Sequence, residues 1–201
     1  MNMTNFLKLA SASVVALALT ACATSPMDKA PMTDESDMMK SEGVMFGGAM
    51  MYPSKTIVEN ASAADNLTTL VALVKQAELV DTLSGPGPFT VFAPTDDAFA
   101  VVPDAVKNQL MEDRNRPMLQ NILTYHVLPG KITASDLMAM ISANGGTYSA
   151  ETVSGTDLTF RVIDGKVKVI DENNAMATVT AADVLQSNGV VHIINAVLMP
   201  Q

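Results

Sequence analysis

The apolar positions of this chain follow a helical spacing in its first half and a strand spacing near its end. Between residues 65 and 84, small and apolar residues recur every three or four positions, which indicates one buried helical stripe. Its members are Leu67, Leu70, Val71, Val74 and Ala77. Asp65 or Asn66 can cap the start of this helix, and Gly85 suits a left-handed stop before Pro86. The pattern predicts a structural helix at the start of a folded domain.

A strand and several shorter helices are predicted next. Residues 89–93 alternate, but both sets of positions are largely apolar, so we expect a strand buried between two layers. Thr95 or Asp96 can cap a helix that begins near Asp97. Helical spacing returns over residues 104–112, over residues 118–126, and from Thr133 or Ser135 to Ile141.

The last third of the chain has the spacing of strands. Residues 158–163 and 166–170 flank Asp164-Gly165, which is a strong signal for a two-residue hairpin turn. Residues 177–185 and 190–198 flank a loop that contains Asn188-Gly189, which indicates a second hairpin. Helices gather first and antiparallel strands follow, so the predicted fold class is α+β, in one domain over residues 53–201.

Residues 1–21 have the features of a bacterial lipoprotein signal peptide. Lys8 precedes an apolar run of eleven residues from Leu9 to Leu19. A bilayer span needs about 20 residues, so this run is typical of a secretory leader. Leu19-Thr20-Ala21-Cys22 is similar to a lipobox, whose cysteine is acylated after cleavage. An ordinary signal peptide is the alternative. Ala23 rather than Asp after the cysteine suggests, by resemblance to Gram-negative lipoproteins, an outer-membrane lipoprotein in the periplasm or at the cell surface.

Residues 22–52 predict a lipidated, methionine-rich flexible tether. Residues 23–52 carry seven of the fifteen methionines and show no sustained period. Met38, Met39, Met45, Met50 and Met51 could supply soft thioether ligands to copper(I), or could be consumed by oxidants. The simpler interpretation, which we favour, is that methionine is tolerated in a loose segment, because the tether adds no histidine or further cysteine.

Charge and cysteine content exclude several classes of function. The net charge of −9 opposes binding to nucleic acid and electrostatic docking on anionic lipid. Cys22 is the sole cysteine, so no internal disulfide can form. The sequence shows no phosphate loop, no dinucleotide-type glycine motif and no nucleophile elbow. We therefore expect a non-enzymatic monomer without a cofactor.

Three stretches identify a known family: Thr90–Phe99 (TVFAPTDDAF), Tyr125–Gly130 (YHVLPG) and Ser187–Pro200 (SNGVVHIINAVLMP). In this order they resemble the fasciclin (FAS1) domain, a family of extracellular adhesion and matrix-binding modules. The resemblance runs from about Pro53 to Pro200. It implies a compact, antiparallel β wedge or sandwich flanked by helices, and a protein that adheres or binds without doing chemistry.

The resemblance also supplies candidate partner-binding residues. Tyr125 and His126 match the family's Tyr-His motif, which is associated with receptor binding in animal members. Asp183 and Val184 match the Asp-Ile of integrin-binding motifs, although Ala181 and Ala182 replace the charged or proline residues found there. Asn195 stands where many members have Asp. For Tyr125 and His126 we favour a structural role at a helix end.

The two histidines and the paired acids are the remaining candidates for metal binding or catalysis. His126 and His192 lack an identifiable third ligand or nucleophile, so we favour buried histidines that are bonded to the backbone. Asp96-Asp97 and Asp171-Glu172 lack the spacing of a calcium loop, and capping and turn formation explain them. The expected function is therefore a lipid-anchored envelope module for adhesion to protein or polysaccharide. The alternative is an envelope stress or copper-handling lipoprotein that uses its methionines.

Overall fold

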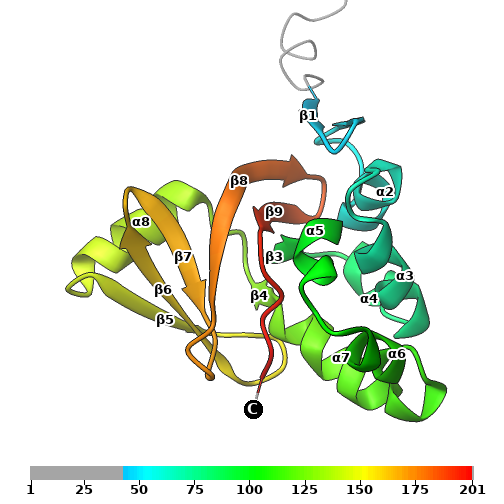
Figure 1. Ribbon diagram of the computed structural model, residues 1–201. Helices are drawn as coiled ribbons and strands as arrows, with labels where there is room; N and C mark the ends of the chain where they lie inside the picture. Colours follow the sequence, from blue (N-terminus) through cyan, green and yellow to red (C-terminus); the bar gives the residue numbers. More distant parts are fainter. Residues whose placement is uncertain (1–42, 201) are drawn as a thin grey trace, which may run out of the picture. The chain divides into compact units, whose positions relative to one another are not determined.

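A computed structural model describes residues 43–200 as helices packed on a seven-stranded mixed sheet (Figure 1). Cys22, Met38, Met39 and the predicted leader lie outside the described residues. The helices are α2 (Ile57–Ala63), α3 (Thr68–Gln76), α4 (Val80–Ser84), α5 (Asp96–Ala100), α6 (Asp104–Leu110), the 3-10 helix η1 (Asp113–Asn115), α7 (Arg116–Tyr125) and α8 (Ala134–Ala143). The strands are β1 (Val44–Phe46), β2 (Ala49–Met51), β3 (Phe89–Pro94), β4 (Val127–Pro129), β5 (Thr147–Glu151), β6 (Asp157–Ile163), β7 (Lys166–Ile170), β8 (Met176–Gln186) and β9 (Gly189–Ile194).

The sheet has the order β4-β3-β9-β8-β7-β6-β5, and one neighbouring pair in it is parallel. That pair is β3 and β9, which run in register from Phe89 opposite Gly189 to Pro94 opposite Ile194. All other neighbours are antiparallel. The α+β class is confirmed, but the expected antiparallel arrangement is wrong for the pair β3 and β9, the second and third strands from the β4 edge. Strand β9 returns from its hairpin with β8 alongside β3, whose direction it shares.

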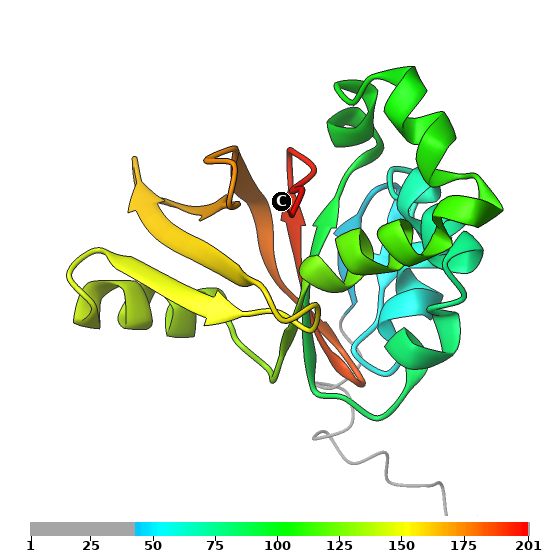
Figure 2. The same ribbon diagram turned by 90° about the horizontal axis from the view of Figure 1, so that it is seen from below.

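Two apolar cores lie on opposite faces of the central strands. Helices α2 to α7 pack on one face and enclose what we call the first core. Helix α8 covers β5 to β7 on the other face and encloses the second core (Figure 2). Strand β3 contributes to both cores, because Val91 and Ala93 face the first and Phe92 faces the second. The sequence prediction of a strand between two layers is therefore confirmed.

The helical stripe over residues 65–84 forms two helices rather than one. Glu78 has φ 58°, in the left-handed region, and this break separates α3 from α4. Gly85 has φ −64°, so the predicted left-handed stop is wrong. The predicted cap is also wrong, since Leu67 holds the capping position without a side-chain bond. The free amides of Thr68 and Thr69 instead donate to Asp96, 28 and 27 residues further on.

Residues 44–51 form a β-hairpin, which differs from the flexible tether that composition predicts. Gly47 and Gly48 turn the chain with φ 57° and 77°, a conformation that suits glycine. The amide of Asp65 donates to the carbonyl of Gly47 at 2.8 Å. Met51 is 2% exposed and belongs to the first core. The hairpin forms because these few contacts join it to α2 and its following loop, and none of them leaves a periodic signal in the sequence.

Other local predictions are confirmed. Asp164 and Gly165 both have positive φ and join β6 to β7 as a two-residue turn. Thr95 caps α5, and Thr133 caps α8 in a capping box with Asp136. The edge strand β5 has no counterpart in the sequence prediction, because its sequence, TYSAE, has few of the β-branched residues that favour strands.

Candidate functional site

Tyr125 lies at the end of α7 with its ring fully buried. Its hydroxyl donates to the carbonyl of Asp157 at 3.2 Å and accepts from the amide of Glu172 at 3.3 Å. Burial raises the pKa of Tyr125 to about 12, so the phenol stays protonated. Tyr125 thus ties the end of α7 to β6 and to the loop after β7.

His126 is buried next to Tyr125 and uses both ring nitrogens within the protein. Nε2 accepts a hydrogen bond from the amide of Leu198 at 3.1 Å, so the ring proton lies on Nδ1 and is donated to the carbonyl of Ile122 at 2.8 Å. Burial holds the pKa of His126 below its usual range, which keeps the ring neutral. The geometry matches the structural role favoured for this pair, and partner binding through it stays a prediction.

His192, on β9, also has both ring nitrogens bonded within the protein, but the roles of Nδ1 and Nε2 are exchanged relative to His126. Its Nδ1 accepts from the amide of Asp183 at 3.3 Å, and its Nε2 donates to the carbonyl of Ile132 at 2.9 Å. The ring stacks on Phe92 with centroids 5.4 Å apart. Burial lowers the pKa of His192 as well. Both histidines are therefore neutral and link two backbone segments through hydrogen bonds. Neither has a ring nitrogen free for proton transfer.

Asp183 and Val184 occupy an irregular part of β8. Asp183 has φ 58°, and its carboxylate accepts from the amide of Ala134, the first residue of α8, at 2.8 Å. Val184 is buried in the first core. The structure thus gives both residues a packing or capping role, and recognition of a partner through them stays a prediction.

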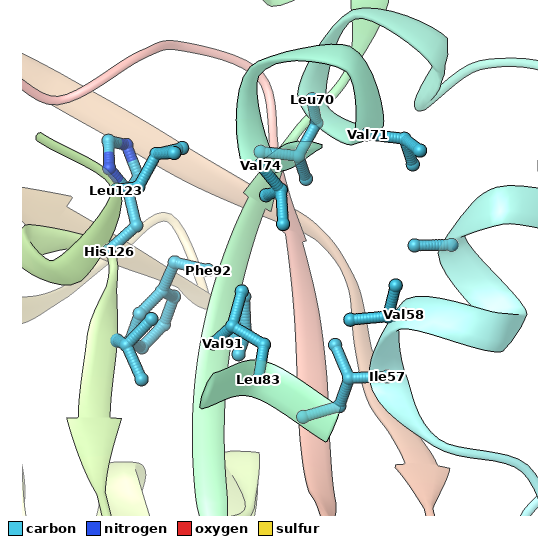
Figure 3. A pocket seen from close by; sticks show the side chains of 12 residues that line it. Ile57, Val58, Leu70, Val71, Val74, Leu83, Val91, Phe92, Leu123 and His126 are labelled. Carbon is cyan, nitrogen blue, oxygen red and sulfur yellow. The ribbon is translucent and has the colours of Figure 1, made fainter. Parts of the chain in front are cut away.

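A small apolar cavity of about 40 Å³ lies among α2, α3, α4, β3 and α7 (Figure 3). Val58 and Ala61 from α2 and Val71 from α3 are its partly exposed lining residues, and the other lining side chains are buried. His126 also lines it, but both ring nitrogens are already bonded. No carboxylate belongs to the lining. This cavity could hold a small apolar group and offers no acid–base chemistry.

One aspartate of each acidic pair serves as a hydrogen-bond acceptor for the backbone. Asp96 caps α3, while Asp171 accepts from the amides of Asn173, Ala175 and Met199. Within residues 43–200, no group of three or more His, Cys, Asp or Glu side chains could hold a metal ion.

The methionines of the β1–β2 hairpin divide into buried and exposed. Met51 packs in the first core. Met45 and Met50 lie opposite each other in the hairpin and are 66% and 41% exposed. Of the candidate copper ligands in the described part of the chain, Met45 and Met50 are therefore placed toward solvent.

Three cations, missed by the sequence analysis, share one face of the sheet. Arg161 on β6 lies directly opposite Lys168 on β7, and Lys166 lies two residues before Lys168 on the same face. We call Arg161, Lys166 and Lys168 the basic face. The alternation RVI-DG-KVKV around the hairpin turn could have revealed it, because a period of two places these side chains together.

The fold is that of a fasciclin domain. It resembles a solved FAS1 domain pair from the insect cell adhesion molecule Fasciclin I, with a TM-score of 0.64 and 21% identity, over 72% of this chain and 51% of that one. Residues 65–200 match the fasciclin domain family. The chain therefore belongs to the fasciclin domain family, as its three sequence stretches predicted.

Two bacterial relatives are similar over most of the domain. Protein sll1483 of Synechocystis is 48% identical over 145 residues, which are 72% of this chain and 73% of that protein. Cell surface glycolipoprotein MPB83 of Mycobacterium bovis is 36% identical over 155 residues, which are 76% of this chain and 63% of that protein. The second name places a protein with a similar domain at a cell surface.

Proposed function

We propose that this protein is a non-catalytic binding module of the cell envelope, anchored by lipid on Cys22, that adheres to protein or polysaccharide. The observation that carries the proposal is the similarity over 155 residues to a protein named a cell surface glycolipoprotein. The leader, which ends in Leu19-Thr20-Ala21-Cys22, supports export and acylation.

The lipid is the element of the proposal that brings the domain to a membrane. No helix among residues 43–200 is long and apolar enough to cross a bilayer. Several acyl chains, at about 0.8 kcal/mol for each buried methylene, would anchor the protein stably. Ala23 favours the outer membrane as the destination.

The absence of catalysis is supported by the state of the two histidines. Each is neutral and has both ring nitrogens bonded to the backbone. The cavity beside His126 has no carboxylate in its lining. General acid–base catalysis requires a titrating group within hydrogen-bond reach of a substrate, and His126 and His192 do not meet that requirement.

Adhesion of a deletion strain tests the proposed function. We expect weaker adhesion or biofilm formation by the deletion strain, and full recovery with the wild-type protein. The Cys22→Ala protein should leave the membrane fraction and restore adhesion poorly. Full adhesion by the deletion strain would show that the adhesive role is absent.

Protease treatment of intact cells distinguishes a surface location from a periplasmic one. A surface-exposed domain is degraded in intact cells, whereas a periplasmic domain is degraded only after the outer membrane is opened. Cys22→Ala is the control for anchoring, because the soluble protein should be protected in the periplasm or released into the medium.

A second candidate function is copper handling, which the exposed pair Met45 and Met50 favours. Cross-strand side chains at this spacing can approach a shared soft ion, and thioethers prefer copper(I). Met45→Leu/Met50→Leu should lower copper tolerance while leaving adhesion intact. Met51 is unsuitable for this test because its replacement would disturb the core.

A further inference from the structure

The described residues are acidic as a whole, with nine lysines and arginines against sixteen aspartates and glutamates. Three of the nine cations, Lys107, Arg114 and Arg116, form the ion pairs with carboxylates in this part of the chain. The other six have no carboxylate within 4.0 Å among residues 43–200. Half of these six form the basic face, on two adjacent strands.

The geometry of the basic face keeps its charges close together and accessible. Arg161 and Lys166 are exposed, and Lys168 is half-buried with its ammonium donating to the hydroxyl of Thr178 at 2.5 Å. The register places Arg161 opposite Lys168, so their Cβ atoms lie about 5 Å apart. On the reverse side of these strands, Phe160 and Val169 pack in the second core, which holds the face in place.

This arrangement is unfavourable for the isolated domain. Like charges directly opposite each other on adjacent strands are destabilising. Acidic residues outnumber basic ones in the described part of the chain. Even so, no carboxylate there lies within ion-pair distance of the basic face. A bound anion would remove the repulsion and gain the attraction of three cations at once.

We propose that the basic face binds an acidic polysaccharide, a linear chain that carries carboxylates on its sugar units. The proposal rests on the proposed adhesive function and names the chemical class of its partner. The cations are about 5 to 7 Å apart across and along the strands, which is the length scale of one sugar unit. The hydroxyls of Thr178 and Thr159 lie on the same face. The first accepts from Lys168 and the second bonds to Ser149, and each has capacity left for a sugar hydroxyl.

The shape of the charge pattern favours a narrow polymer over a lipid surface. Glu151 on β5 and Asp157 on β6 lie opposite each other on the same face of the sheet, at the end far from the β6–β7 turn. Asp157 lies four residues from Arg161, about 13 Å along the strand. An anionic bilayer would cover both ends and bring these carboxylates against its headgroups. A polysaccharide chain that crosses β6 and β7 at Arg161 and Lys168 meets the cations, while the exposed carboxylate of Asp164 lies beyond them in the turn.

Binding to alginate, a linear polyuronate, tests the proposal. The full chain, purified in neutral detergent, is titrated with alginate, with neutral dextran, and with vesicles containing phosphatidylglycerol. The test variant is Arg161→Gln/Lys166→Gln/Lys168→Gln. The matched control is Lys55→Gln/Lys75→Gln/Lys131→Gln, which removes three exposed cations that lie outside β6 and β7 and form no ion pair among residues 43–200, and which changes the net charge equally. Thermal unfolding of each variant verifies that it is folded.

We expect alginate binding that is lost at least tenfold in the test variant and changed less than about twofold in the control. Raising salt from 50 to 500 mM should weaken the wild-type interaction at least about tenfold, because released counterions drive such binding. The proposal is overturned if wild type does not bind alginate at 50 mM salt, if both variants lose binding equally, or if only the vesicles bind.

The failure of this inference can be told apart from failure of the proposed function. A deletion strain that adheres normally contradicts the adhesive function itself. A deletion strain with an adhesion defect that the test variant repairs completely contradicts only the role of the basic face. Repair by the control and not by the test variant is the result expected if both are correct.

Discussion

At the scale of single residues, hydrogen bonds fix the protonation state of both histidines. In His126 and in His192, one ring nitrogen donates to a carbonyl and the other accepts from an amide. A second proton would place an N–H group against an amide N–H group. Burial adds to this effect, so the pKa of each ring is lowered.

These lowered pKa values predict a loss of stability in mild acid. The unfolded histidines take up protons as the pH falls below about 6.5, while the folded ones resist protonation. The contribution is therefore complete above pH 6.5 and is lost below it, by up to about 1.4 kcal/mol per pH unit for each histidine. Urea unfolding at pH 7.5, 6.0 and 5.0 measures this. Equal stability at all three values would contradict the neutral assignment.

The repulsion within the basic face also has a measurable cost at the level of one residue. Arg161→Gln should raise the free energy of unfolding by about 0.2 to 1 kcal/mol at low salt, because it removes a like charge opposite Lys168. Lys75→Gln is the control, since it changes the net charge equally on an exposed helical position. The difference between the two variants should shrink in 0.5 M salt, as screening predicts.

At the scale of elements, helix α3 depends on a residue of another helix. The carboxylate of Asp96 accepts from the amides of Thr68 and Thr69 and from the hydroxyl of Thr68. Its pKa is affected first by burial, which raises it, and the combined hydrogen bonds then lower it below the usual range. Asp96 thus joins the start of α3 to the first turn of α5.

Removing this cap should destabilise the domain. Asp96→Ala is expected to lower the free energy of unfolding by about 1 to 2 kcal/mol, the upper range for a lost capping side chain. Asp97→Ala is the matched control, because Asp97 is exposed on the same helix and accepts no such bond. Urea unfolding at pH 7 gives both values. Equal losses in the two variants would show that the cap is unimportant.

The β1–β2 hairpin gives a second prediction for an element. Met51→Ala should lower the free energy of unfolding by about 2 to 4 kcal/mol, because it opens a cavity in the first core. Met50→Ala, one residue earlier and 41% exposed, should change it by less than about 0.5 kcal/mol. Similar small effects in both variants would indicate that the hairpin is not part of the folded unit.

The elements show which parts of the fold a sequence can predict. Thr95, Thr133 and the Asp164-Gly165 turn act on residues close to them in sequence, so short-range patterns identify them. The cap of α3 comes from 28 residues away, and no local pattern contains it. The hairpin was missed for the same reason, since its contacts are with α2 and the loop after it.

At the scale of the whole described domain, the sequence was enough to predict the family. It predicted the arrangement of the candidate site only in part. The three stretches identified a fasciclin domain, which the match over residues 65–200 confirms. The neutral state of His126 depends on Leu198, 72 residues away, and could not be read from sequence. The basic face needed only the strand register, which the hairpin turn already implied.

The long-range strand pairing of the domain also predicts slow folding. The pairing of β3 with β9 joins Phe89 to Gly189, a separation of one hundred residues, and such contacts slow folding. Refolding after dilution from urea should therefore take milliseconds to seconds rather than microseconds. Stopped-flow circular dichroism is the suitable measurement, because the chain has no tryptophan. A microsecond phase that completes folding would contradict this expectation.

The parallel pairing of β3 with β9 has a consequence for the proposed passage of this protein across a membrane. Strand β3 enters the sheet between β4 and β9, and β9 is the last strand of the described chain to be synthesised. A partly translocated chain therefore lacks the partner that completes both cores. On the export route proposed above, the domain would stay unfolded until almost all of it had crossed. The order of the strands would therefore keep the chain unfolded during transport. The domain would fold only in the compartment where the protein acts.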